Sequence, residues 1–431
     1  MAQIASPSPR ICPALEGMEP LEVANQLRHL PGLCFFDTSG HLPSSASQPV
    51  SLIAASPSGI LQGSIHRAED RVGLRAALAE LPEVKGDHGF PLGGLAGWVS
   101  YEGEFIFGRY AQMLIFDHGH GQWWELGNLS GQLKDSTDQN VSISPFESRQ
   151  TEQHFVESVE LIQEWIRAGD IYQVNLSQAF EAKVSGGSLF GLYETLRDAS
   201  PAPMSAWLDL AGREVLSSSP ESFLKISGRQ VETRPIKGTR PRFEDPDEDR
   251  RSAYELQTSP KEIAELVMIT DLLRNDLGQV CEFGSVEVDE MLQLETLEQV
   301  HHLVSTIRGT LNRDNDAIHC LAACFPGGSI TGAPKKRAME IISEVEGRQR
   351  GIYCGAIGWL GANGESSFNI AIRTLVREGE RLSYQVGAGI VADSDPAHEY
   401  QETLHKAAGM RLAIERWQDP LEQSSSKLGI L

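Results

Sequence analysis

The sequence is poor in cysteine, with 6 cysteines in a chain of 431 residues. None of them lies in a Cys-x-x-Cys pair. So few and so widely spaced cysteines exclude a small secreted scaffold held by disulfides. His319, Cys320 and Cys324 suggest a metal cluster at first sight, but the two cysteines lie one helical turn apart in the apolar run CLAACF. We therefore predict buried free thiols at these positions.

Cationic residues are also scarce, because Lys and Arg total 37 against 59 Asp and Glu, for a net charge of -22. An acidic surface disfavours nonspecific binding to nucleic acid or to anionic membranes. No run of about 18 apolar residues is present, so no transmembrane helix is predicted. The start of the chain, MAQIASPSPRICPALEG, lacks the basic and apolar segments of a signal peptide. The expected location is the cytoplasm.

The length is typical of two or three domains. Residues 134–152 (KDSTDQNVSISPFESRQTE) are polar and weakly periodic, so we place the main boundary there. The prediction is an N-terminal region over 1–150, a catalytic region over 151–418 and a flexible tail over 419–431. Residues 39–50 are expected to form a loop.

Local patterns predict several helices and strands in the second region. Residues 154–168 have apolar side chains at helical spacing, and Gly169 can end that helix. The segment IYQVNLS alternates apolar and polar residues, which indicates a strand with one apolar and one polar face. Ser259 and Asp395, each followed by proline, are typical helix starts.

Turn residues predict antiparallel strands between these helices. Residues 222–234 are expected to form a hairpin that turns around Arg229. Residues 351–391 are expected to form a meander with turns at Gly364 and Gly379. Antiparallel strands interspersed with helices predict an α+β fold.

The expected hairpin brings an acid and an amine into register. Glu221 lies eight residues before Arg229 and Lys237 eight residues after it, so antiparallel pairing would place their Cβ atoms roughly 5 Å apart. Such a pair can supply a general acid and a nucleophile. The alternative is a cross-strand salt bridge at the surface. The turn-rich surroundings, SSSPE and PIKGT, favour the functional interpretation.

Four glutamates near the starts of two expected helices form a candidate metal site: Glu262 and Glu265, and Glu399 and Glu402. In each pair the carboxylates are one helical turn apart, and four such oxygen donors suit Mg²⁺. Each pair also has a structural explanation, because Ser259-x-x-Glu262 is a capping box and acidic residues stabilise a first helical turn. Lys406, four residues after Glu402, can be its ion-pair partner.

Glycine-rich segments and an arginine indicate a ligand that carries carboxylates. The segment PGGSITGAPKKR presents backbone N–H groups ahead of a helix expected near Pro334, and VGAGIVADS lets a ligand approach the backbone closely. Arg373 falls within an otherwise apolar strand, where it can bind a carboxylate or form a structural ion pair. His301 and His302 face opposite ways on a strand, so at least one of them is a structural histidine.

Four segments, in this order, resemble the chorismate-utilising enzymes related to anthranilate synthase component I. They are PIKGTRPR, SPKEIAELVMITDLLRNDLGQV, FPGGSITGAPKKRAMEII and VGAGIVADSDPAHEYQET. The resemblance is strong over about 150–415 and weaker before. It implies a large β-sandwich flanked by helices, with chorismate as substrate. It also implies that Mg²⁺ is held by Glu265 and Glu402, with Glu262 and Glu399 nearby and acting through water.

The resemblance also assigns roles to residues around the substrate. Glu221 matches the general acid that protonates the leaving 4-hydroxyl, and His302 matches the histidine near the departing group. The positions that match substrate contacts are Gln173, Ser329, Tyr353, Arg373, Gly387 and Lys406.

Two positions distinguish the branches of the family. Isochorismate and salicylate synthases have a water-activating lysine where this chain has Gln173, and anthranilate synthases have alanine where it has Lys237. A lysine at that position is characteristic of the branch that forms aminodeoxychorismate, in which the lysine attacks C2 of chorismate and ammonia then adds at C4.

The resemblance therefore implies formation of 4-amino-4-deoxychorismate for 4-aminobenzoate and folate synthesis. The implied partner is a glutamine amidotransferase subunit that supplies ammonia in a heterodimer. The alternatives are an anthranilate synthase component I and a non-catalytic chorismate-binding paralogue. The presence of Lys237 and of the acidic residues disfavours both.

Overall fold

The computed structural model describes residues 8–39, 49–82, 84, 88–136, 140–297 and 300–418. The expected tail, 419–431, lies outside the described residues, and so does most of the expected loop at 39–50.

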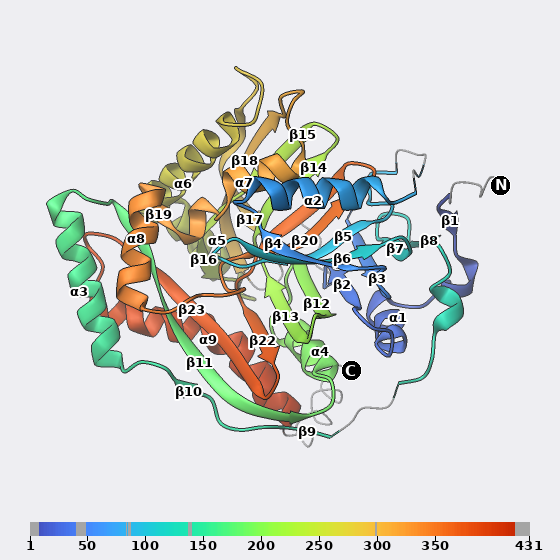
Figure 1. The fold of residues 1–431 in the computed structure, drawn as a ribbon. Coiled ribbons are helices and arrows are strands. Elements are labelled where there is room, and N and C mark those ends of the chain that lie inside the picture. Colours follow the sequence, from blue (N-terminus) through green and yellow to red (C-terminus); the bar gives the residue numbers. More distant parts are fainter. Residues whose placement is uncertain are drawn as a thin grey trace.

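Two large antiparallel sheets form the centre of the fold (Figure 1). The first follows the order β1 (Arg10–Ile11), β8 (Gln122–Leu126), β7 (Met113–Asp117), β3 (Val50–Ala54), β2 (Cys34–Asp37), β12 (Met204–Leu210), β13 (Arg213–Ser219), β22 (Thr374–Glu378), β23 (Arg381–Ile390), β11 (Gln173–Gly186) and β10 (Glu147–Ser148), with β9 (Val141–Ile143) and β19 (Gly332–Ala333) also paired to β11. The second follows the order β16 (Ile236–Pro241), β18 (Val300–Thr310), β15 (Gln230–Arg234), β14 (Ser222–Ser227), β21 (Glu365–Ile370), β20 (Ala356–Gly361), β5 (Gly94–Val99), β6 (Glu104–Tyr110) and β4 (Ile60–Ser64), with β17 (Glu287–Thr296) paired to β18.

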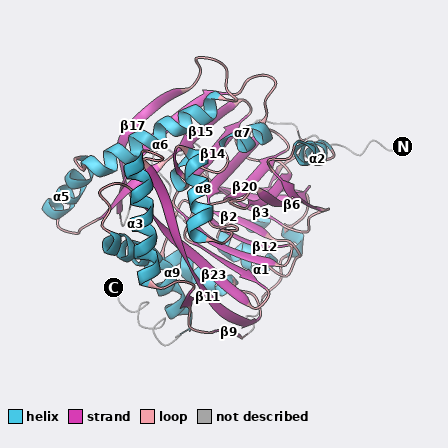
Figure 2. Cartoon of the chain, turned by 60° about the vertical axis from the view of Figure 1, so that its left-hand side comes forward, coloured by secondary structure: helices cyan, strands magenta, loops and turns pink. Residues whose placement is uncertain are grey.

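Helices cover the outer faces of both sheets. The helices are α1 (Pro20–Leu27), α2 (Ala68–Ala79), α3 (Glu152–Ala168), α4 (Phe190–Ala199), α5 (Pro246–Gln257), α6 (Pro260–Gly278), α7 (Ala317–Cys324), α8 (Lys335–Glu346) and α9 (Pro396–Gln418), with short 3₁₀ turns η1 (Pro13–Leu15), η2 (Ser130–Gln132) and η3 (Gly328–Ile330). Helices α1, α4 and α9 pack on the first sheet, and α2, α6 and α7 share a core with the second. Helices α3 and α8 lie along β11, beside α9 (Figure 2).

Three apolar layers follow from this arrangement. One fills the space between the two sheets, and the other two lie between each sheet and its helices. This sandwich with helical cover confirms the predicted α+β fold. Within the described part of the chain, no helix is both long enough and apolar enough to cross a membrane.

The locally encoded elements appear where the sequence predicts them. Helix α3 ends at Gly169, which adopts the left-handed conformation with φ 82°. Ser259 caps α6 and Asp395 caps α9 through side-chain oxygens. The thiols of all six cysteines are free and buried, as predicted for Cys320 and Cys324.

The hairpin forms, but its predicted symmetry about Arg229 is wrong. Strands β14 and β15 pair Ser227 with Gln230, and their register shifts by a bulge after Ser222. Lys237 belongs to the next strand, β16, and pairs with Leu303 on β18. Glu221 and Lys237 are therefore not a cross-strand pair, because the chain has already left the hairpin at Lys237.

The expected meander over 351–391 is divided between the two sheets. Its turns fall at Gly364 and Gly379 as predicted, with φ of 88° and 61°. However, β20 and β21 belong to the second sheet, whereas β22 and β23 belong to the first. The placement of Arg373 in a strand is therefore wrong, because β21 ends at Ile370 and Arg373 lies in the crossover with φ 49°.

The polar segment 134–152 does not separate the sheets. Strands from before residue 150, such as β2 and β5, pair within each sheet with strands from after it. The N-terminal region therefore contributes strands to both sheets.

Two of the places where the chain switches between the sheets lie side by side. One is Pro220-Glu221, between β13 and β14, and the other is residues 371–373, between β21 and β22. The backbone N–H of Ile370 donates to the carbonyl of Glu221 at 3.1 Å, and that of Ser218 donates to the carbonyl of Arg373 at 3.1 Å. This pairing of crossovers places Glu221 and Arg373 in one cavity.

Candidate active site

A cavity of about 180 Å³ lies at the two crossovers. The residues predicted from the sequence that line it are Glu221, Lys237, His302, Ser329, Tyr353, Arg373, Gly387 and Lys406. They come from β16, β18, β23, α9, the 3₁₀ turn η3 and the loops between such elements, so only the folded chain brings them together. Gln173 and the four candidate metal glutamates are not part of this lining.

Glu221 is a buried carboxyl group with 6% exposure. Burial raises its pKa to about 7, although a hydrogen bond with Ser329 and the charge of Lys237 act in the opposite direction. The group is therefore substantially protonated near neutral pH, as a general acid must be.

Lys237 reaches the cavity from β16 and lies beside a carboxylate. Its Nζ is 3.7 Å from Oε2 of Glu265, on α6. The surface cross-strand salt bridge with Glu221 that the sequence left as the alternative is therefore wrong, and the ion-pair partner of Lys237 is Glu265. The charge of Lys237 nevertheless acts on Glu221, so the amine and the acid share one site.

The two adjacent histidines face opposite ways on β18, as expected. Nδ1 of His302 lies 3.1 Å from Oγ1 of Thr239 and 3.3 Å from the carbonyl oxygen of Gly238. Burial lowers the pKa of His302 to about 4, so its imidazole is neutral at physiological pH. His301 instead lies 3.0 Å from Asp249 on the other face and is structural.

Arg373 supplies a positive charge to the cavity. Burial lowers its pKa, and no carboxylate of the described residues forms a salt bridge with it. The structure therefore disfavours the structural ion pair and leaves the guanidinium to face an anionic group of a ligand.

Gly387 permits the close approach of Asn175 and Tyr353. A Cβ atom there would lie 2.7 Å from Oδ1 of Asn175 and 2.9 Å from the hydroxyl of Tyr353, closer than carbon atoms tolerate. The ammonium of Lys406 donates to the carbonyl of Gly387 at 3.1 Å and pairs with Glu402 at 2.7 Å. The predicted Glu402–Lys406 pair is thus confirmed, and it also lies at the cavity.

The four glutamates of α6 and α9 lie beside the cavity among lysines. Lys261 is 3.4 Å from Oε1 of Glu399, and its pKa is raised by Glu399, Glu265 and Glu402, against the effect of burial. Gln173 is buried and directs Nε2 toward Glu265 at 3.4 Å. An ammonium group thus already lies within reach of three of these carboxylates.

Glu262 has less of a capping role than the sequence suggests. Its backbone N–H donates to Oγ of Ser259 at 3.5 Å, but the N–H of Ser259 donates to Leu256 rather than to the carboxylate of Glu262. Instead, Oε2 of Glu262 lies close to Gly238, next to Lys237. The reciprocal half of the capping box is missing, and the carboxylate faces the site.

The chemistry of these donors fits a hard divalent cation. They are carboxylate oxygens, and Oε2 of Glu399 is buried without a hydrogen-bond partner. However, no group of three His, Cys, Asp or Glu side chains in the described ranges is arranged closely enough to hold a metal ion. The Mg²⁺ site therefore stays a prediction.

The sequence analysis missed three polar residues that line the cavity: Asn175, Thr239 and Gln385. Asn175 had a signal, because it lies two residues after Gln173 on the polar face of the same strand. Gln385 had none, since only the packing of the two sheets brings β23 against the cavity.

A buried ion pair connects two segments that line this cavity. Nη2 of Arg350 lies 2.7 Å from Oε1 of Glu346, and both side chains are almost completely buried. Arg350 also donates to the carbonyls of Asn175 at 2.6 Å and Ile330 at 3.1 Å. It therefore ties β11 to the turn that carries Ser329.

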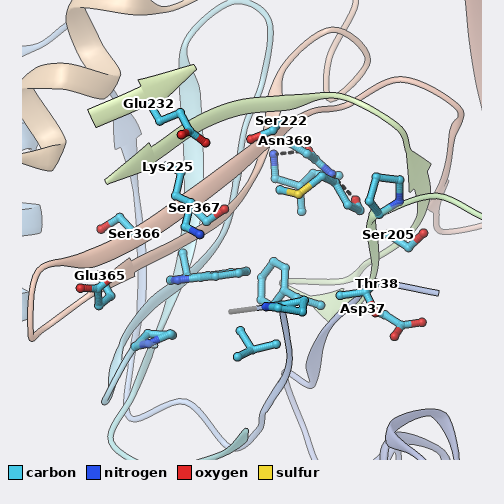
Figure 3. A pocket seen from close by; sticks show the side chains of 18 of the residues that line it. Asp37, Thr38, Ser205, Ser222, Lys225, Glu232, Glu365, Ser366, Ser367 and Asn369 are labelled. Carbon is cyan, nitrogen blue, oxygen red and sulfur yellow. Dashed lines mark hydrogen bonds between the residues drawn. The ribbon is translucent and has the colours of Figure 1, made fainter. Parts of the chain in front are cut away.

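A separate cavity of about 150 Å³ lies between the sheets and shares no lining residue with the first (Figure 3). Lys225 on β14 is paired in register with Ser367 on β21 at its wall. Asn369 donates to the carbonyl of Met204 at 2.9 Å across the gap between the sheets. Asp37, at the other side, pairs with Arg197 at 2.6 Å.

Residues 81–411 match the family described as chorismate binding enzyme. The chain is 36% identical over 375 residues to aminodeoxychorismate synthase component 1 of Bacillus subtilis. The aligned part covers 77% of this chain and 80% of that protein. It is 48% identical over 267 residues to anthranilate synthase component 1 of Streptomyces coelicolor, which covers 62% of this chain and 52% of that protein.

A solved structure shows the same architecture. The anthranilate synthase component I of Streptococcus pneumoniae superposes with a TM-score of 0.74 at 29% identity, over 86% of this chain and 93% of that one. Relatives of both kinds match this chain, so the choice between them depends on the residues of the cavity.

Proposed function

Because the chain belongs to the family of chorismate binding enzymes, we propose that it converts chorismate and ammonia to 4-amino-4-deoxychorismate. The observation that carries this proposal is that the amine of Lys237 and the protonated carboxyl of Glu221 share one cavity. Such an arrangement suits nucleophilic attack at one end of the conjugated ring diene while a hydroxyl leaves from the carbon next to its other end.

In the proposed first step, Lys237 loses a proton and its nitrogen bonds to C2 of chorismate. Both ring double bonds shift, the C4–O bond breaks, and Glu221 gives its proton to the leaving oxygen, which departs as water. The proton that Lys237 loses passes to solvent water, because Glu265, 3.7 Å from Nζ, is proposed as a ligand of Mg²⁺.

In the second step, ammonia bonds to C4, both double bonds shift back, and the bond between C2 and the lysine nitrogen breaks. The proton that the new amine releases restores Glu221 or the lysine. Arg373 and Lys406 are proposed to bind the carboxylates of the substrate, and neutral His302 to orient the departing group.

We further propose Mg²⁺ as the cofactor, held by Glu265 and Glu402 with Glu262 and Glu399 nearby. When bound, the ion would neutralise a carboxylate of chorismate close to the ring. The names of the relatives contain "component 1", which supports a second subunit, and we propose a glutamine amidotransferase that supplies ammonia. The end use would be 4-aminobenzoate and folate synthesis in the cytoplasm.

A second candidate function is the formation of anthranilate, because anthranilate synthase component 1 also matches closely. In that reaction ammonia itself would attack C2, and no bond to Lys237 would form. The two candidates therefore differ in one observable intermediate.

The test is to incubate the chain with chorismate and Mg²⁺ without ammonia and to measure its intact mass. We expect an adduct equal to chorismate less one water, on the peptide that contains Lys237. Lys237→Arg should abolish it, because arginine stays protonated, whereas the exposed Lys183→Arg serves as the matched control and should keep it. Absence of the adduct, together with anthranilate as the product once ammonia is added, would support the second candidate.

A further inference from the structure

The cavity that contains Glu221 and Lys237, the reaction cavity, lies next to a larger one. This second cavity, the ionic cavity, has a volume of about 790 Å³ and walls that carry ion pairs. Arg149 pairs with Glu181 at 2.5 Å and Arg381 pairs with Glu378 at 2.7 Å at its outer end, and both arginines are more than half exposed. A space of this size with charged walls that reach the surface holds water.

The two cavities meet along one face of β23. Ser383 lines only the ionic cavity, Gly387 lines only the reaction cavity, and Gln385 lies between them and lines both. These residues are two apart on one strand, so their side chains share a face. Tyr353 also lines both cavities and completes the contact between them.

Gln385 is held firmly in this position. Its Oε1 accepts a hydrogen bond from Arg348, and its Nε2 donates to the carbonyl of Arg350 at 2.7 Å. Both ends of the amide are therefore used within the protein, which fixes the side chain as a wall rather than leaving it free to bind a ligand.

We propose that Gln385 is a specificity-determining residue that keeps the water of the ionic cavity away from the lysine-bound intermediate. The inference rests on the proposed function, in which that intermediate must wait for ammonia. If water adds at C4 instead, the C2–N bond breaks, the lysine leaves and chorismate is formed again. Gln385 thus favours the addition of ammonia, because it excludes the competing water from the intermediate.

The experiment measures how the intermediate partitions between water and ammonia. The variants react with chorismate and ammonia in ¹⁸O-labelled water, and mass spectrometry measures ¹⁸O in the 4-hydroxyl of recovered chorismate beside the amino product. Gln385→Ala should raise the ratio of exchange to amination by about tenfold, equal to a relative barrier change of about 1.4 kcal/mol. Gln385→Met, which keeps the volume, should stay within about twofold of the wild type.

Ser383→Ala is the matched control, because Ser383 lies on the same strand face but borders only the ionic cavity. It should leave the ratio unchanged. The adduct mass of Gln385→Ala shows that its reaction cavity still forms. An unchanged ratio in Gln385→Ala with the adduct present would overturn the inference alone. A fall in the ratio would also overturn it and would identify the ionic cavity as a route for ammonia. A wild-type chain that forms neither the adduct nor the amino product would overturn the proposed function itself.

Discussion

The buried ion pair of Arg350 and Glu346 allows a quantitative test of what stabilises the segments around the cavity. Arg350 and Glu346 have side-chain exposures of 1% and 0%, and two hydrogen bonds of 2.7 and 3.0 Å join them. Arg350→Met would leave the Glu346 carboxylate buried with hydrogen bonds from Ser177 and with Arg348, 3.8 Å away, as its remaining cation. Breaking a buried pair on one side costs about 3–5 kcal/mol where the remaining charge is uncompensated, and the second cation Arg348 places the loss at the lower end of this range. Glu346→Leu should cost a similar amount for the same reason.

The double variant Arg350→Met/Glu346→Leu removes both charges, so its cost should not exceed that of the more damaging single variant. The carbonyls of Asn175 and Ile330 lose a donor in Arg350→Met and in the double variant, at about 1–3 kcal/mol each, but keep it in Glu346→Leu. Urea unfolding followed by circular dichroism and tryptophan fluorescence measures the free energy of unfolding of each variant.

The control is the exposed pair of Arg274 and Asp271, 3.1 Å apart. Arg274→Met should cost at most about 1 kcal/mol. If the losses of the two buried single variants add in the double variant to within about 0.5 kcal/mol, the two residues do not act as a pair and the reasoning is refuted.

The remaining predictions concern the chemistry. Glu221 loses its proton with a pKa of about 7, so the pH profile of the rate of adduct formation measured without ammonia should bend near pH 7. Glu221→Gln should remove that bend and lower the rate about a hundredfold or more, and a wild-type profile without the bend would exclude Glu221 as the acid. Glu402→Gln should raise the concentration of Mg²⁺ needed for activity, and an unchanged Mg²⁺ titration would remove Glu402 from the metal site. Lys237→Ala should let ammonia reach C2 and shift part of the product toward anthranilate, which chromatography detects; the unchanged amino product at the wild-type rate would contradict the nucleophile assignment. The isolated chain should use free ammonia, increasingly at high pH, but should not hydrolyse glutamine, and glutamate released by the purified chain would contradict the need for a second subunit.

Features that depend on neighbours in the chain were predictable from the sequence. The starts of α6 and α9 follow from capping residues, and the end of α3 follows from a glycine, because each signal acts within one helical turn. The alternation in IYQVNLS predicted β11, and the chemical types of the site residues pointed to an acid, an amine and a carboxylate ligand. Eight of these residues indeed line one cavity.

The pairing of distant segments was decided only by the tertiary structure. Local turns predicted one meander, but burial of both faces divides it between two sheets and moves Arg373 from a strand into a crossover. The hairpin symmetry placed Lys237 opposite Glu221, whereas the actual strand pairing gives it Glu265 as its ion-pair partner. The role proposed for Gln385 depends entirely on two cavities that meet at its side chain. Sequence spacing cannot specify such contacts, because they form between residues that only the packing of one sheet against the other brings together.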